Sequence, residues 1–210
     1  MSMNSDWKSF LCFVLASALV VSLLFPCSMT IILVEPIDAS VYAGIEINSF
    51  GWDGERAIYK ELAAKFTRPC TEAFDEAGLR SPLRLATESG IVIHHFGDLY
   101  THEAEDLGLV SNKTRSIYRA EFSTGRAQAG TVPAVRSGIR LTTDGRPRIF
   151  IHDSAFFGES FWFSRLALSD VLTHELIHAG GQPSTPGWLG FFQHDLAGFE
   201  HYDKIMNACR

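Results

Sequence analysis

The sequence lacks the signatures of several common classes of enzyme and nucleic-acid-binding protein. It contains no Gly-x-Ser-x-Gly nucleophile motif, no glycine-rich phosphate-binding loop and no Cys-x-x-Cys metal motif. Internal repeats and low-complexity tracts are also absent, which argues against a repeat architecture or a disordered chain. Basic residues are outnumbered, because 18 Lys and Arg stand against 24 Asp and Glu for a net charge of −6. No basic field is therefore present to displace counterions from a nucleic acid.

Cysteine is scarce, with only four residues in the chain. Cys12 and Cys27 lie in an apolar N-terminal stretch, which leaves Cys70 and Cys209 for the rest of the protein. In an oxidising compartment, a single pair favours one disulfide. In the chain-entropy model such a bond contributes about 4–5 kcal/mol, because it closes a long loop in the unfolded state. The alternative is a pair of buried free thiols.

The N-terminal stretch has no charged residue from Phe10 to Val34. As a helix this run would extend ~37 Å, which exceeds the ~30 Å hydrocarbon core of a bilayer. Lys8 precedes the run, so the rest of the chain is expected outside the cytoplasm, with the N-terminus inside. Residues 1–43 are therefore interpreted as a signal anchor or a cleaved signal peptide with a linker, and residues 44–210 as one folded domain.

Local patterns predict an α+β domain. Helices are expected over 54–67, 70–77, 165–179 and 195–208, because apolar residues recur at helical spacing and Gly78 and Gly180-Gly181 supply stop signals. Strands are expected over 91–96 and 117–122. The segments 139–142 and 148–152 are expected to form a hairpin across Asp144-Gly145, and residues 35–52 and 127–138 to be irregular. The predicted architecture is a small mixed sheet packed against the 165–179 helix and a C-terminal helix.

One five-residue motif, His174-Glu175-Leu176-Ile177-His178, carries the strongest chemical signal. On a helix the two histidines lie on one face, where two imidazole nitrogens can bind one zinc at about 2.0–2.1 Å. Glu175 would lie beside the open coordination position and accept a proton from a zinc-bound water. The motif predicts metal-assisted hydrolysis with one Zn²⁺ as cofactor. The alternative is an amphipathic helix with two structurally satisfied histidines.

This motif resembles the signature of the zincin metallopeptidases. In zincins the signature helix packs against a twisted sheet whose edge strand lines the substrate cleft, and the strand-like segment 148–152 is the candidate for that edge. Ser184 stands where metzincins have a third histidine, and Lys204 where thermolysin-like enzymes have an acidic residue. The resemblance is thus to zincins in general, and it implies a peptide or protein substrate.

A third zinc ligand is needed, because two protein ligands bind zinc weakly. His194 is favoured, since imidazole is the commonest donor and this residue precedes the last predicted helix. Asp195, Glu200 and His201 remain alternatives, Asp195 also as a partner of a ligating histidine. Tyr202 or His201 is a candidate donor to a developing oxyanion, a role worth ~3–4 kcal/mol where it exists.

Two other functions fit the same residues. One is a non-catalytic extracytoplasmic binding domain that keeps zinc as a structural staple, in which case four protein ligands would close the site. The other is a hydrolase that acts on a non-peptide amide. Aromatic residues in 156–163 and 188–192 flank the motif and are candidates for cleft walls, although core packing is the commoner role for such residues.

Overall fold

The computed structural model describes residues 39–123, 127–156, 167–183, 196 and 199–210. All of them belong to one compact unit, Ile37–Arg210. No helix in these ranges is long and apolar enough to cross a membrane. The apolar run Phe10–Val34 lies outside the described residues.

A four-stranded mixed sheet forms the centre of the domain, in the order β1-β2-β6-β3. β1 (Ile45–Asn48), β2 (Ile91–His95) and β6 (Arg148–Ile151) are parallel, whereas β3 (Ala129–Val132) runs antiparallel beside β6. Every residue of β6 is buried, as expected for a central strand covered on both faces. The α+β class with a small mixed sheet is therefore confirmed.

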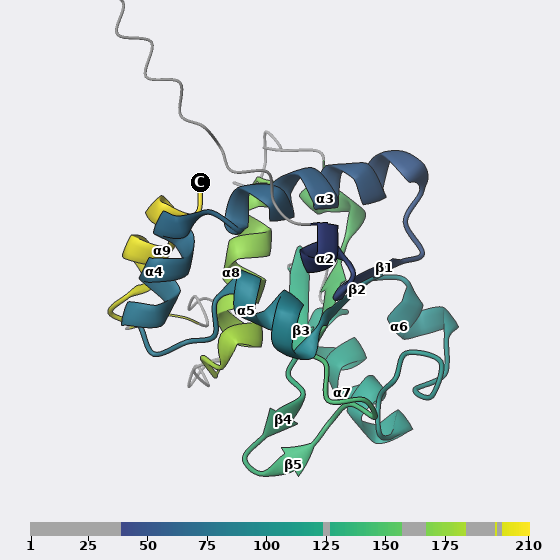
Figure 1. The fold of residues 1–210 in the computed structure, drawn as a ribbon. Helices are drawn as coiled ribbons and strands as arrows, with labels where there is room; N and C mark the ends of the chain where they lie inside the picture. Colours follow the sequence, from purple (N-terminus) through teal and green to yellow (C-terminus); the bar gives the residue numbers. More distant parts are fainter. Residues whose placement is uncertain (1–38, 124–126, 157–166, 184–195, 197–198) are drawn as a thin grey trace, which may run out of the picture. The chain divides into compact units, whose positions relative to one another are not determined.

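Four helices pack on one another, and one of them lies against the sheet at β3 and β6 (Figure 1). α8 (Leu168–Gly180) contacts β3 and β6, and α3 (Trp52–Lys65) contacts α8. α9 (Tyr202–Ala208) packs against both α8 and α4 (Arg68–Glu76). Their apolar side chains form one large core, in which Ile58, Phe74 and Leu176 are fully buried. The predicted contact of the signature helix with the sheet and a C-terminal helix is present.

Shorter elements complete the described structure. They are α2 (Ala39–Tyr42), α5 (Pro82–Arg84), η1 (Leu85–Ser89), α6 (Asp98–Thr101), α7 (Asn112–Phe122), β4 (Val135–Arg136), β5 (Ile139–Arg140) and η2 (Asp153–Ala155).

The predicted secondary structure of three segments is wrong, because the local pattern of apolar residues does not show which segments pair with distant parts of the chain. Residues 117–122 form the end of helix α7, because Ser111 caps its first turn and Tyr118 and Phe122 contact each other one turn apart. The supposed linker 35–52 contributes α2 and β1. The supposed loop 127–138 contains β3 and β4, since β3 gains its ladder from β6, which is distant in sequence.

The hairpin predicted across Asp144-Gly145 is also wrong. β5 pairs with β4, and β6 is interior, between β2 and β3. Asp144 is instead an ion-pair partner of Arg146 and Arg148, at 2.6 and 3.0 Å. The segment 148–152 is therefore not an edge strand; the edge strands of the described sheet are β1 and β3.

The boundaries of α3, α4 and α8 differ from the expected ones by one to three residues. α8 begins at Leu168 rather than at residue 165, with Ala167 as its N-cap, whereas α3 begins at Trp52 rather than at residue 54, with Gly51 as its N-cap. The last helix begins at Tyr202, so Glu200 lies in the turn before it.

The expected disulfide between Cys70 and Cys209 is present and joins the N-terminal turn of α4 to the end of α9. The fully buried Lys65 ammonium donates to the Cys209 carbonyl and to the Ser169 hydroxyl, each at 2.5 Å. Burial lowers the pKa of Lys65, an effect that Glu61 and Asp170 oppose. The C-terminal residues are thereby fixed against α3, α4 and α8.

A second core cluster on the other side of the sheet encloses His94. Its imidazole stacks on Phe150 with ring centres 5.2 Å apart. Burial and the nearby Arg148 lower the pKa of His94 to about 4, although the carboxylates of Asp98 and Glu46 oppose the shift. The folded protein therefore holds this histidine neutral under conditions in which the unfolded chain protonates it.

We expect this difference to make the domain acid-sensitive. Stability is complete above the unfolded pKa of about 6.5 and falls as the pH drops toward 4, because the unfolded state then binds the additional proton. The loss is about 3 kcal/mol at pH 4 relative to pH 7. Urea unfolding of His94→Gln should lack this component of the pH dependence. The control His102→Gln, at a more exposed partner of Asp98, should retain it.

Candidate active site

Helix α8 positions the signature residues and is buried on almost every side. Leu172, Leu176 and Ile177 are inaccessible to solvent, which anchors the helix in the large core. Glu175 is 5% exposed and His178 7%, whereas His174 is half-buried. Ionisable groups are rarely placed in such surroundings unless they have partners, so their contacts indicate how the site is built.

The imidazoles of His174 and His178 lie side by side, one helical turn apart. Their ring centres are 5.0 Å apart and their planes are inclined by 73°. Two imidazoles that share a tetrahedral zinc, with nitrogens ~2.0–2.1 Å from the ion, have ring centres about 5 Å apart. The distance between the ring centres therefore equals the one that a shared zinc ion would require.

The end of α8 orients His178. Gly181 adopts φ +125°, a conformation that favours glycine, and its N–H returns to the His178 carbonyl. This turn brings the Gln182 carbonyl within 2.8 Å of His178 Nδ1. A carbonyl only accepts hydrogen bonds, so Nδ1 must be the protonated nitrogen and Nε2 carries the lone pair. Ligating histidines in metal sites usually have such a second hydrogen bond.

The side chain of Glu175 contacts β3, an edge strand of the described sheet. The hydroxyl of Thr131 in β3 lies 2.8 Å from Glu175 Oε2 and 3.1 Å from the Glu175 backbone carbonyl. Since a hydroxyl donates one proton at a time, these two acceptors share it. The carboxylate is thus held by a neutral hydroxyl from the neighbouring strand. Sequence reasoning missed Thr131, because it lies in the segment that was expected to be a loop.

The three predicted residues near the start of α9 diverge. Tyr202 lies against His174, with ring centres 6.1 Å apart. His201 is close enough to Glu76 in α4 to lower the pKa of that carboxyl, after the larger effects of Lys204. Glu200 is exposed in the preceding turn. Among these three residues, Tyr202 is therefore the one that the structure brings to the histidine pair.

The favoured third ligand, His194, and the alternative Asp195 lie outside the described residues. Within the described ranges, no group of three or more His, Cys, Asp or Glu side chains is arranged to hold a metal. Of the predicted site, the structure therefore describes the histidine pair and Glu175 on α8, and Glu200, His201 and Tyr202 near the start of α9.

Two described cavities lie elsewhere, at the carboxyl ends of the parallel strands. They have volumes of ≈ 350 and ≈ 430 Å³, and His95 lines both. Its Nε2 lies 2.9 Å from Asp153 Oδ1, and its Nδ1 accepts from the Gly97 N–H. Both ring nitrogens are therefore engaged. His152 lines the first cavity and Asp153 the second, and no described residue of α8 lines either.

Comparisons with protein-family models, curated proteins and solved structures found no match to this chain.

Proposed function

We propose that the protein is a zinc-dependent hydrolase of the metallopeptidase class that acts outside the cytoplasm. The observation that carries the proposal is the packing of the His174 and His178 rings, 5.0 Å apart, on the helix that also carries Glu175. His178 presents Nε2 as its lone-pair nitrogen because Nδ1 is bound to Gln182. The export signal or membrane anchor is proposed from the uncharged run Phe10–Val34.

The residues of the candidate site have the following roles in this proposal. His174 and His178 bind the ion, and His194 is the proposed third ligand. A bound zinc ion supplies a water molecule whose pKa falls to about 7. Glu175 would accept a proton from water activated in this way, while Thr131 holds Oε2 and so fixes the orientation of the carboxylate. Tyr202, against His174, is the proposed oxyanion donor.

The zincin fold is part of the same proposal. It is supported by the antiparallel strand β3, which lies beside β6 at the edge of the described sheet and contacts Glu175 through Thr131. An extended peptide bound along β3 would have its backbone next to the general base. The sequence suggested segment 148–152 as the edge strand of the cleft. The proposal assigns this role to β3, which contacts α8.

The direct experiment is a cleavage assay with the purified full chain and a mixed peptide library. Cleavage should occur at neutral pH, stop on chelation and return when zinc is added. A chain that unfolds on chelation and cleaves neither peptides nor simple amides would instead be the non-catalytic, zinc-stabilised domain.

Removal of the Thr131 hydroxyl tests its positioning role. We expect Thr131→Val to lower peptidase activity by about 10–100-fold with zinc content unchanged, because the carboxylate loses its donor. Thr131→Ser keeps the hydroxyl and should restore most of the activity. If Thr131→Val and Thr131→Ser are equally active, the hydroxyl does not position the base.

A further inference from the structure

A short hairpin, β4–β5, extends from the end of β3 (Figure 1). Val135 pairs with Arg140 and Arg136 with Ile139. The two central residues, Ser137 and Gly138, have φ +50° and +78°, as in the type I′ turn that matches the natural twist of two strands. All six residues 135–140 are exposed.

The hairpin carries exposed apolar side chains. Val135 is 56% exposed and Ile139 66%. Val110, 52% exposed, lies at its base, where its N–H donates to the Leu141 carbonyl. Because residues paired across two strands lie on the same face, Val135 shares one face with Arg140 and Ile139 shares the other with Arg136. Each face of the hairpin therefore presents one exposed β-branched side chain beside one cation.

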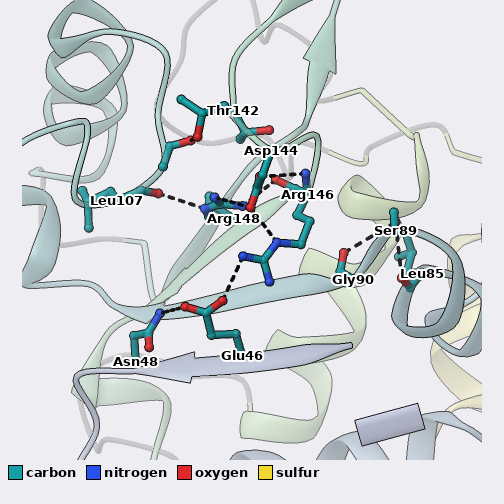
Figure 2. Close-up of polar contacts among 12 residues, drawn as sticks. Glu46, Asn48, Leu85, Ser89, Gly90, Leu107, Thr142, Asp144, Arg146 and Arg148 are labelled. Carbon is teal, nitrogen blue, oxygen red and sulfur yellow. Dashed lines mark hydrogen bonds and ion pairs between the residues drawn. The ribbon is translucent and has the colours of Figure 1, made fainter. Parts of the chain in front are cut away.

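The charge of the hairpin is purely positive. No acidic residue occurs between Ser123 and Thr143, although the whole chain has a net charge of −6. Among the described residues, neither Arg136 nor Arg140 forms an ion pair with a carboxylate. The nearby carboxylates of Glu46 and Asp144 are taken by Arg146, at 2.9 and 2.6 Å (Figure 2). The hairpin thus combines two uncompensated cations with apolar side chains.

The hairpin leaves the sheet at the end where the parallel strands begin. Val132, the last residue of β3, pairs with Arg148, the first residue of β6. β1, the opposite edge strand, begins at the same end of the sheet and follows α2 after Ala43 and Gly44. Only Glu35 to Asp38 separate α2 from the uncharged run that ends at Val34, and a connection of this length spans at most about 14 Å.

We propose that the β4–β5 hairpin binds the surface of an anionic phospholipid bilayer. Arg136 and Arg140 contact lipid phosphates, while Val135 and Ile139 insert among the headgroups. The sequence favours a bilayer over an acidic polypeptide, since the uncharged run that is the candidate membrane segment ends at Val34, only four residues before α2. This proposal goes beyond the hydrolase function and requires no turnover.

The test is hydrogen–deuterium exchange of the full chain in nanodiscs. Discs of phosphatidylcholine alone are compared with discs of an equal mixture of phosphatidylcholine and phosphatidylglycerol. Amides of residues 134–141 should exchange more slowly in the anionic discs. Arg136→Gln/Arg140→Gln should raise that exchange rate by about 30-fold, since each cation near an anionic surface contributes about fivefold to binding. The matched control Arg56→Gln/Lys60→Gln removes two exposed cations of α3 and should change nothing at the hairpin.

Val135→Ser/Ile139→Ser tests the apolar part and should also restore fast exchange, whereas Ile117→Ser in α7 should not. Equal exchange of residues 134–141 in both kinds of disc would overturn the proposal. Protection that appears only when a polyglutamate peptide is added would overturn it as well and would assign the hairpin to an acidic protein partner.

Discussion

Replacing Glu175 by glutamine should reduce the rate of peptide hydrolysis by about 10²–10⁴-fold, the usual contribution of a general base. Glutamine has nearly the same shape and still accepts a hydrogen bond from Thr131, which lies 2.8 Å from Glu175 Oε2. It cannot take a proton from water at neutral pH. The loss should therefore appear in kcat, with little change in KM, in an assay of the fluorogenic peptide that the wild-type chain cleaves best.

Zinc content and unfolding free energy provide the controls for Glu175→Gln. Both should match those of the wild type, because the histidine pair and the packing of α8 are untouched. Glu105→Gln is a matched variant, since Glu105 is exposed and lies on neither α8 nor α9, so its loss should leave the rate unchanged. A Glu175→Gln variant as active as the wild type would exclude the proposed base.

Replacing His178 by alanine should weaken zinc binding by more than a hundredfold. Loss of an outer hydrogen-bond partner of a ligand already costs 10–100-fold, and loss of the ligand itself should exceed that. His174→Ala should have a comparable effect, because both rings belong to the same pair. Competition with a chromophoric chelator measures the affinity directly and does not depend on a substrate.

Two further variants separate ligands from neighbours. His194→Ala should also lower the affinity if His194 is the third ligand, and it decides between this residue and Asp195. His95→Ala is the matched control, because His95 lies beside the two cavities at the strand ends and not on α8. Unchanged zinc affinity in both His174→Ala and His178→Ala would remove the basis for the metal centre.

Local patterns in the sequence predicted the helices better than the strands. The residues of α3, α4 and α8 repeat at helical spacing and end at Lys65, Glu76 and Gly180, close to the expected positions. β3 could not be found in this way, because Ala129–Val132 contains a glycine and gains its strand conformation from β6. β6 was recognised as a strand but given the wrong partner, since its neighbours β2 and β3 are distant in sequence.

The core of the candidate site was predictable from five consecutive residues, whereas its supporting contacts were not. The spacing of His174 and His178 fixes their common face on a helix. The two glycines after the motif predicted the end of α8. Nothing in the sequence predicted that the Gln182 carbonyl would lie beside His178 Nδ1. Thr131 reaches Glu175 across more than forty positions of chain, a contact that only tertiary folding creates.

The most direct measurement of the central claim is an anomalous-difference map from crystals of the full chain, collected at the zinc absorption edge. We expect one peak within bonding distance of His174 and His178, with one further protein ligand and an open coordination position facing Glu175. A map with no peak beside these rings, or with a peak enclosed by four protein ligands, would contradict the assignment of this helix as the catalytic centre of a zinc hydrolase.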